Sequence, residues 1–207
     1  MITIVDYGMG NLASIRNMLA RIGQPAQTTD DVALIAEATK LILPGVGSFD
    51  AAVANIEGRG LRPVLDKKVL VERVPILGIC LGMQLMTRSS EEGTASGLGW
   101  LPADTIRFDL TAHEKPHPIP HMGWNTVRPI RPHPLFTPSD TEHRFYFVHS
   151  YHVRCDREED VLATTKYGDY FTSAFSHSNI IGVQFHPEKS HRYGMELLRN
   201  FSEWVAC

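Results

Sequence analysis

Residues 75–86 carry the pattern that most limits how this chain can fold. An apolar run of strand length, Pro75 to Ile79, meets a Gly-x-Cys-x-Gly motif centred on Cys80, and apolar residues then resume at helical spacing. The pattern predicts a strand, a sharp turn and a helix, and the glycines allow other segments to approach the turn closely. Cys80 is therefore a candidate nucleophile, because amide donors at the start of a helix favour the thiolate. A buried, purely structural cysteine is the alternative.

Strands and helices alternate through the first 90 residues, which indicates a parallel sheet with right-handed helical crossovers. After Arg88 the expected strands are short, so antiparallel pairing is expected there. We expect strands at residues 2–6, 40–43 and 75–79 and near 105–108, 122–127, 145–152, 161–166, 171–176 and 180–185, with helices near 12–22, 32–38, 51–57, 61–72 and 191–205. We predict an α/β fold in one domain, residues 1–207, with a mixed, largely parallel central sheet flanked by helices and additional antiparallel strands in the C-terminal half.

The composition argues against several classes of function. The net charge is −3, with 43% hydrophobic and 21% charged residues, which is ordinary for a soluble globular protein and offers no basic surface for nucleic acid. The N-terminus lacks a basic signal region, and no apolar run approaches the roughly 20 residues of a membrane span, so a cytoplasmic protein is expected. Cys80, Cys155 and Cys207 have unrelated spacings, which indicates reduced thiols rather than disulfides or a zinc ribbon.

One glycine motif suggests a cofactor that its neighbours disfavour. Gly8-x-Gly10-x-x-Ala13 lies between an expected strand and an expected helix, as in dinucleotide-binding folds, with Asp30-Asp31 about 20 residues further on. However, Asp6 would repel a phosphate at this turn. Asp30-Asp31 also fit the cap and first turn of the next helix. We therefore expect no cofactor.

A run of histidines suggests a metal site that the chain does not support. His113, His117 and His121 recur at every fourth residue, which on a helix would align three metal ligands. Prolines at positions 116, 118 and 120 interleave them and forbid that helix. We expect a loop here and no metal.

A second chemical motif lies at the end of the last expected strand. The segment Gly182-Val-Gln-Phe-His-Pro-Glu-Lys189 places His186 at a strand end and Glu188 two residues later. Such a histidine can act as general base to a nucleophile, and the carboxylate can orient the ring and stabilise its charged form. Pro44-Gly-Val-Gly47 follows another strand, and its glycines free backbone amides to form an oxyanion site. In a parallel sheet functional residues gather at the carboxyl ends of the strands, where the 44–50 loop and Cys80 both fall. Taken with the Gly-x-Cys-x-Gly motif, the His-Pro-Glu segment proposes Cys80 as nucleophile, His186 as acid and base, and Glu188 as the group that orients it.

The chain resembles the triad-type, class-I glutamine amidotransferases over nearly its whole length, in Pro44-Gly-Val-Gly47, Gly78-Ile-Cys-Leu-Gly-Met-Gln84 and Gln184-Phe-His-Pro-Glu188. Within that family it is similar to the HisH glutaminase subunits of imidazole glycerol phosphate synthases, in Pro-Gly-Val-Gly, Pro120-His-Met-Gly-Trp-Asn125 and Phe145-Tyr-Phe-Val-His-Ser-Tyr151. The resemblance implies hydrolysis of glutamine to glutamate. It also implies a heterodimer, in which ammonia passes to a (β/α)8-barrel cyclase subunit of the HisF type for histidine biosynthesis.

The same resemblance implies roles for further residues. Backbone amides of Leu81 and of the 45–47 loop, Val46 in particular, would hold the oxyanion. The segments that hold glutamine in the family match Gly47, Gln84, His149, Ser150 and Tyr151. Positions at or near the partner surface and ammonia route match Asn11, Met122, Trp124, Tyr146 and Lys189. Core packing is an equally good explanation for Trp124 and Tyr146, since aromatic residues are common in cores and interfaces alike.

Four other hypotheses stay open at this stage. Three segments are also similar to HisH-like paralogs that supply ammonia for surface-sugar amidation: Tyr7-Gly-Met-Gly-Asn11, Gly97-Leu-Gly-Trp100 and Lys189-Ser-His-Arg-Tyr-Gly-Met195. A free-standing γ-glutamyl cysteine hydrolase would use the same triad without a partner. A non-catalytic binding module would need Cys80 only as a buried residue, and a dinucleotide-binding oxidoreductase would use the Gly8–Ala13 turn.

Overall fold

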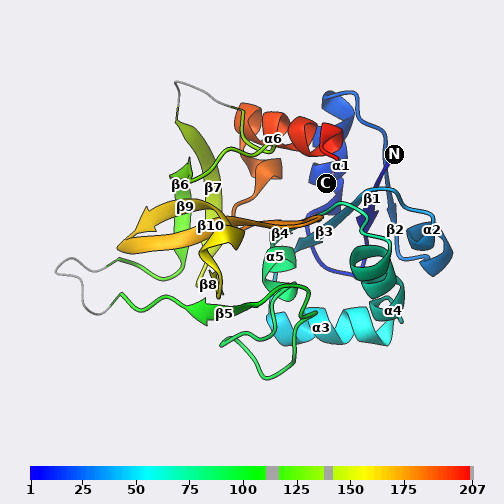
Figure 1. Ribbon diagram of the computed structural model, residues 1–207, viewed down its shortest axis with the longest axis horizontal. Coiled ribbons are helices and arrows are strands. Elements are labelled where there is room, and N and C mark those ends of the chain that lie inside the picture. Colours follow the sequence, from blue (N-terminus) through cyan, green and yellow to red (C-terminus); the bar gives the residue numbers. More distant parts are fainter. Residues whose placement is uncertain (111–116, 138–141, 206–207) are drawn as a thin grey trace.

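The structure is a computed structural model that describes residues 1–110, 117–137 and 142–205. Within these residues eleven strands form one sheet, with helices on both of its faces (Figure 1). The strands are β1 (Ile2–Val5), β2 (Ala26–Thr29), β3 (Leu41–Gly45), β4 (Ile76–Cys80), β5 (Ala103–Arg107), β6 (His121–Pro129), β7 (His143–His149), β8 (Tyr151–Cys155), β9 (Val161–Tyr167), β10 (Asp169–His177) and β11 (Ile180–Val183). The α-helices are α1 (Leu12–Arg21), α2 (Val32–Ala36), α3 (Phe49–Gly58), α4 (Arg62–Asp66), α5 (Leu81–Leu85) and α6 (His191–Glu203). Shorter turns of helix are η1 (Lys67–Val71), η2 (Glu158–Asp160) and η3 (Pro187–Lys189).

The sheet has a parallel half and an antiparallel half. Strands β2, β1, β3, β4 and β11 lie side by side in that order and run parallel. Strands β10, β9, β6 and β7 continue the sheet with antiparallel pairing, and β8 joins β10 to β5. The predicted fold class is therefore confirmed, and the ends of β3, β4 and β11 meet at one edge, as the site requires.

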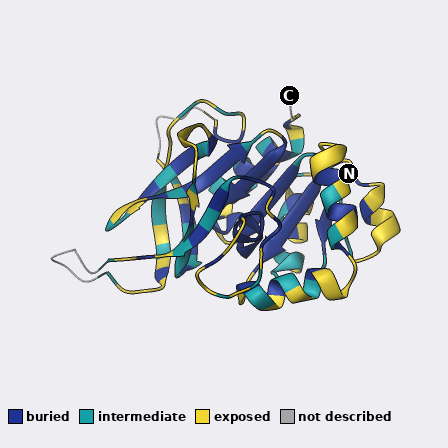
Figure 2. Cartoon of the chain, turned by 60° about the horizontal axis from the view of Figure 1, so that its bottom comes forward, coloured by how far each residue is buried: buried dark blue, intermediate teal, exposed yellow. Residues whose placement is uncertain are grey.

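Helices cover both faces of the parallel half, which explains its apolar sequence. Every residue of β1, β3, β4 and β11 is buried, as expected for strands enclosed on two sides (Figure 2). Successive side chains of β3 enter opposite cores: Leu41 and Leu43 join the core that includes α3, α4 and α5, and Ile42 joins the core under α1 and α6. The sheet thus separates two hydrophobic cores that hold it from both sides.

The helices follow their apolar spacing. Helix α1 buries Ile15 and Leu19, and α6 buries Leu197, Leu198 and Phe201. These two helices lie together on one face of the sheet, opposite α3, α4 and α5 (Figure 1). No helix in the described part of the chain has the length and apolar character needed to cross a membrane.

Three elements differ from the sequence prediction, each for a physical reason. Strand β2 was not predicted, because Ala-Gln-Thr-Thr is a half-buried edge strand without apolar alternation. The strand expected at 145–152 is two strands, β7 and β8, separated at Ser150, which places a bend beside the expected site. The helix expected at 61–72 is α4 followed directly by one π-helical turn, η1.

Lys40 connects the start of β3 to the end of α6. Its ammonium group donates to the carbonyl oxygens of Phe201 at 2.9 Å, Ser202 at 2.7 Å and Trp204 at 2.6 Å. These carbonyls at the helix end lack partners within the helix, and a cation there also complements the helix dipole. One side chain therefore closes the C-terminus of α6 onto the sheet.

We predict that Lys40→Met lowers the free energy of unfolding by about 2 kcal/mol, because three carbonyl groups lose a charged donor. For a chain of this size the melting temperature should fall by about 4–8 °C. The matched control is Lys67→Met, since Lys67 is 67% exposed and lies 3.5 Å from Glu72. Calorimetry that gave the same melting temperature for both variants would contradict the role of Lys40.

Candidate active site

Cys80 lies where β4 ends and α5 begins. Its backbone has φ 54° and ψ −110°, in the left-handed half of the Ramachandran plot, where a residue other than glycine is strained by about 1–3 kcal/mol. Helix α5 starts at the next residue and is buried along its whole length. The predicted strand, sharp turn and helix are confirmed, and the strain is the kind that structures retain at functional sites.

The turn is held by backbones that approach one another too closely for side chains. A Cβ atom on Gly82 would lie 1.8 Å from the carbonyl oxygen of Leu43, and one on Gly45 would lie 2.8 Å from Cβ of Leu81. Beneath this contact the buried Tyr7 hydroxyl donates to the carbonyl oxygen of Pro44 at 2.6 Å. Burial, together with the negative charge of Cys80, raises the pKa of Tyr7, so this hydroxyl remains a donor.

His186 and Glu188 form a buried pair next to Cys80. Nδ1 of His186 lies 2.8 Å from Oε1 of Glu188, and their side chains are 1% and 2% exposed. Burial by itself lowers the pKa of His186, but its interactions with Cys80 and with Glu188 outweigh the effect of burial and raise the pKa to about 10. Nε2, on the other side of the ring, is buried without a hydrogen-bond partner among the described residues and is available to move a proton.

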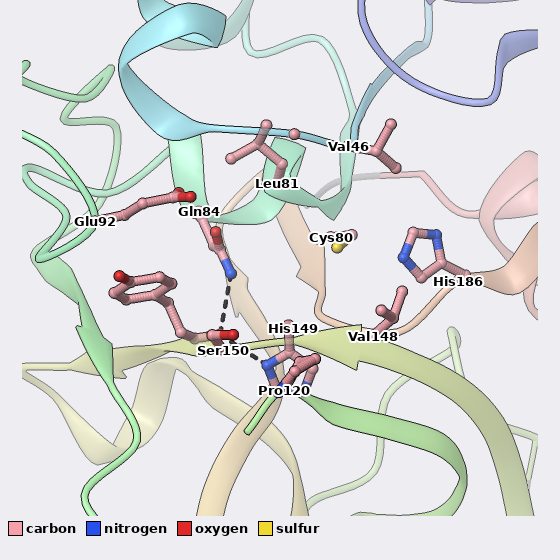
Figure 3. Close-up of a pocket in the computed structure, with 12 residues that line it drawn as sticks. Val46, Cys80, Leu81, Gln84, Glu92, Pro120, Val148, His149, Ser150 and His186 are labelled. Atoms are coloured by element: carbon pink, nitrogen blue, oxygen red, sulfur yellow. Dashed lines mark hydrogen bonds between the residues drawn. The ribbon is translucent and has the colours of Figure 1, made fainter. Parts of the chain in front are cut away.

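A cavity of about 310 Å³ opens at Cys80, with His186 beside it (Figure 3). Among the predicted catalytic, oxyanion and substrate residues, those that line it are Val46, Gly47, Cys80, Leu81, Gln84, His149, Ser150, Tyr151 and His186. Glu188 is paired with Nδ1 of His186. Every predicted catalytic, oxyanion and substrate residue except Glu188 thus lines one cavity. Three residues that were not predicted also line it: Glu92, Pro120 and Val148.

Two glutamines connect the cavity wall to the nucleophile. The amide nitrogen of Gln84 donates to Oε1 of Gln184 at 3.0 Å and to the carbonyl oxygen of Tyr151 at 3.1 Å. The amide nitrogen of Gln184 donates in turn to Sγ of Cys80 at 3.7 Å. The side-chain nitrogen of Gln84 therefore bonds to protein groups, Gln184 and the carbonyl of Tyr151, and stabilises the cavity wall. Gln184 belongs to a quoted motif but received no role from the sequence, since nothing local shows that it faces the thiol.

Comparison with known proteins agrees with this geometry. The family model described as "Glutamine amidotransferase class-I" matches residues 3–204. The chain belongs to the class-I glutamine amidotransferases. Members of this family hydrolyse glutamine, so the cavity at Cys80 is the site at which that chemistry is expected.

Relatives and a solved structure resemble this amidotransferase over nearly all of its length. A protein of Methanococcus maripaludis named "Imidazole glycerol phosphate synthase subunit HisH 2" is 55% identical over 201 residues, which cover 97% of this chain and 98% of the relative. A protein of the same name from Pseudomonas aeruginosa is 46% identical over 205 residues, covering 99% and 100%. A solved structure described as "Crystal structure of glutamine amidotransferase" has a TM-score of 0.74 at 20% identity, covers 98% of each chain and shows the same fold.

Glu92 is the charged residue in the cavity of this amidotransferase that the sequence did not predict. Its carboxylate faces the cavity from the side opposite His186 (Figure 3), and Oε2 accepts from the amide of Phe49 at 3.0 Å. Burial raises the pKa of Glu92 above the usual range, although the hydrogen bond from Phe49 partly offsets the effect. The polar loop 89–97 contains two adjacent acids, Glu91 and Glu92, and gives no local sign that Glu92 is the one that turns inward.

The predicted interface residues of this amidotransferase lie outside the cavity lining, and all are at least partly exposed. Met122 and Trp124 are 62% and 40% exposed, and Trp124 stacks on His191 with ring centroids 5.7 Å apart. Tyr146 pairs with Trp124 across β6 and β7, and Nζ of Lys189 lies 5.6 Å from the centre of its ring. Asn11 precedes α1 in the turn where Gly10 packs against Pro44. Core packing, the alternative explanation for Trp124, does not fit its exposure.

The glycine turn of the amidotransferase is filled by protein groups. The amide of Gly8 donates to Oδ1 of Asp6 at 2.9 Å, which occupies a donor that a phosphate would need. Asp31 caps α2 by accepting from the amide of Ala33 at 2.7 Å, as predicted, and Asp30 pairs with Arg59 at 2.9 Å. Both aspartates therefore contact protein groups in the positions that were considered for ribose binding. The dinucleotide hypothesis is therefore disfavoured.

The structure differs from the predicted loop at one of the three histidines of the run. His113 lies outside the described residues. His117 packs on the ring of Tyr167, and His121 begins β6 and is 3% exposed. His121 thus belongs to a strand and a buried contact rather than to a loop.

We predict that His186 remains protonated through pH 8, and that Cys80→Ala lowers its pKa because the thiolate raises it. Titration of the His186 ring by NMR measures this directly. The matched control is Cys155→Ala. Burial, with Asp160 and Asp156, raises the pKa of that thiol to about 12, so it bears no charge near neutral pH. A pKa near 6.5 for His186 in both the native chain and Cys80→Ala would contradict the ion pair.

Proposed function

We propose that this amidotransferase is the glutaminase subunit of an imidazole glycerol phosphate synthase, with residues 1–207 as a single glutaminase domain. The names of its relatives support the proposal. One structural observation carries it: a cavity that holds a strained cysteine and a buried histidine–glutamate pair at one end and the Glu92 carboxylate at the other. A nucleophile at one end and an anion at the other suit glutamine, whose amide and α-ammonium groups lie at opposite ends of the molecule.

The triad performs the reaction in two steps. The Cys80 thiolate attacks the side-chain amide carbon of glutamine, and the amide oxygen becomes an oxyanion. His186 then protonates the nitrogen, the carbon–nitrogen bond breaks, and ammonia leaves a γ-glutamyl thioester on Cys80. Water next attacks the thioester while His186 accepts its proton, and glutamate departs as the Cys80 thiolate is restored. Glu188 stabilises the charged imidazole and fixes its orientation throughout.

The remaining cavity residues bind glutamine and stabilise the oxyanion. The backbone amides of Val46 and Leu81, two residues that line the cavity, would hold the oxyanion, a role in which one donor is worth about 10²–10³ in rate. Glu92 binds the α-ammonium group by charge. Gly47 and the segment from His149 to Tyr151 form walls of the cavity. Gln84 holds that segment through its hydrogen bond to the carbonyl of Tyr151.

The ammonia requires an acceptor protein, and the exposed surface near the site supports the proposal that such a protein binds there. Met122 and Trp124 leave apolar and aromatic surface open to solvent, with Tyr146 and Lys189 adjacent. A (β/α)8-barrel cyclase subunit of the HisF type is the proposed partner, in a heterodimer. Asn11 and the 8–11 turn would extend the same contact.

A second destination for the ammonia is also supported by an observation. The two relatives described above are named "HisH 2" rather than HisH. Together with the resemblance to paralogs in surface-sugar amidation, this favours testing a cyclase-like partner from that pathway beside the histidine enzyme. A free-standing γ-glutamyl hydrolase would differ from both by full activity without any partner.

We predict that Cys80→Ala abolishes glutamine-dependent synthesis of imidazole glycerol phosphate by the chain and its cyclase subunit. Synthesis from added ammonium salt should stay within about twofold of the native rate, because ammonia needs no thioester. Both rates are measured by product formation. Cys155→Ala, the control, should leave both unchanged.

The paired assay separates the hypotheses. Synthesis from glutamine by the Cys80→Ala complex would overturn the assignment of Cys80 as the nucleophile. Glutamate release by the native chain that no cyclase subunit accelerates or couples to a product would overturn the proposed partner and favour the free-standing hydrolase.

A further inference from the structure

A line of hydrogen bonds connects strand β6 to the cavity wall. The side-chain nitrogen of Asn125 lies 3.1 Å from Nε2 of His121, and Nδ1 of His121 lies 3.0 Å from Nε2 of His149. Nδ1 of His149 lies 2.7 Å from the carbonyl oxygen of Tyr151. His149 and Tyr151 line the cavity, whereas His121 does not.

The cavity end of this line fixes its direction. The carbonyl oxygen of Tyr151 can only accept, so Nδ1 of His149 must carry the hydrogen. In a neutral ring Nε2 of His149 is then an acceptor, and Nδ1 of His121 must donate to it. Nε2 of His121 becomes an acceptor in turn and requires a donor from Asn125.

The far end fixes the same direction independently. The oxygen of the Asn125 amide accepts from the backbone amide of Thr126 at 2.8 Å, and its nitrogen donates to the carbonyl oxygen of Lys166 at 3.0 Å. A backbone amide can only donate and a backbone carbonyl can only accept, which identifies the oxygen and the nitrogen of the Asn125 side chain. The nitrogen therefore faces His121, as the line requires. Two anchors at opposite ends thus assign the Nδ1–H form to both histidines.

The surroundings keep both rings neutral and in place. The ring of His121 packs between Phe147 and Tyr167, with centroids 4.8 Å and 4.0 Å away. Burial lowers the pKa of His121 to about 4 and that of His149 well below its usual value. A proton on either ring would set two N–H groups against each other. The line therefore holds with neutral rings in fixed orientations.

The line ends on a carbonyl that ties together two walls of the cavity. The carbonyl oxygen of Tyr151 accepts from both His149 and Gln84. They join the bend at Ser150, between β7 and β8, to helix α5. We propose that His121 is a positioning residue for glutamine binding: its Nδ1–H fixes the His149 ring and, through it, the wall from His149 to Tyr151. The role rests on the proposed glutaminase function.

The test compares His121→Leu with His121→Asn in the complex with the cyclase subunit. Leucine leaves Nε2 of His149 buried without a donor, and we expect the KM for glutamine to rise about tenfold with kcat within about twofold. Asparagine can present an N–H where Nδ1 stood, and we expect it to restore most of the KM. His152→Leu is the control, because it removes a half-buried imidazole that packs on Phe108 outside the line and should leave the KM unchanged.

A spectroscopic measurement on the chain alone accompanies the kinetics. NMR of isotope-labelled histidine nitrogens should show the Nδ1–H form for His121 and His149, and His149 should lose that single form in His121→Leu. An Nε2–H form at either ring would overturn the inference. So would an unchanged KM in His121→Leu, or equal damage by leucine and asparagine, with the native complex active. If the native complex released no glutamate, the proposed function would fall, and this positioning role with it.

Discussion

The close approach of β3 to the start of α5 is the contact on which the active site depends. Gly82 lies so near the carbonyl of Leu43 that no side chain fits between them, and this packing holds Cys80 in a backbone conformation that it would not adopt alone. The strain is local, while the restraint comes from two buried strands and a buried helix. The thiol is consequently presented at a cavity instead of packing into a core.

Charge balance makes the buried triad tenable. A buried imidazole would ordinarily lose its proton, but interactions with Cys80 and Glu188 raise the pKa of His186 to about 10, so His186 keeps its proton. Burial lowers the pKa of His149 as well, and among the described groups only the hydrogen bond to the carbonyl of Tyr151 opposes it, so this ring stays neutral. One cavity therefore contains a charged histidine for proton transfer and a neutral histidine for a fixed hydrogen bond, and the difference comes from their neighbours.

The sequence predicts what local patterns encode. The elbow at Cys80, the His186–Glu188 pair and the parallel strands are all visible as motifs or apolar runs, because each needs particular residues at fixed spacing. Strand β2, Glu92, Gln184 and the histidine line are different. Their positions depend on which segments far apart in the chain come together, and a polar residue that turns inward has the same letter as one in solvent. Ser150 shows the limit well, since its bend divides an otherwise continuous strand pattern.

The central claim is that a covalent thioester forms on Cys80, and trapping it is the most direct test. Turnover of glutamine by the complex would be quenched in acid and the digested chain weighed by mass spectrometry. The account predicts a γ-glutamyl group on the peptide that contains Cys80, removed by hydroxylamine. Continued turnover with no such adduct, or with the adduct on another residue, would contradict it.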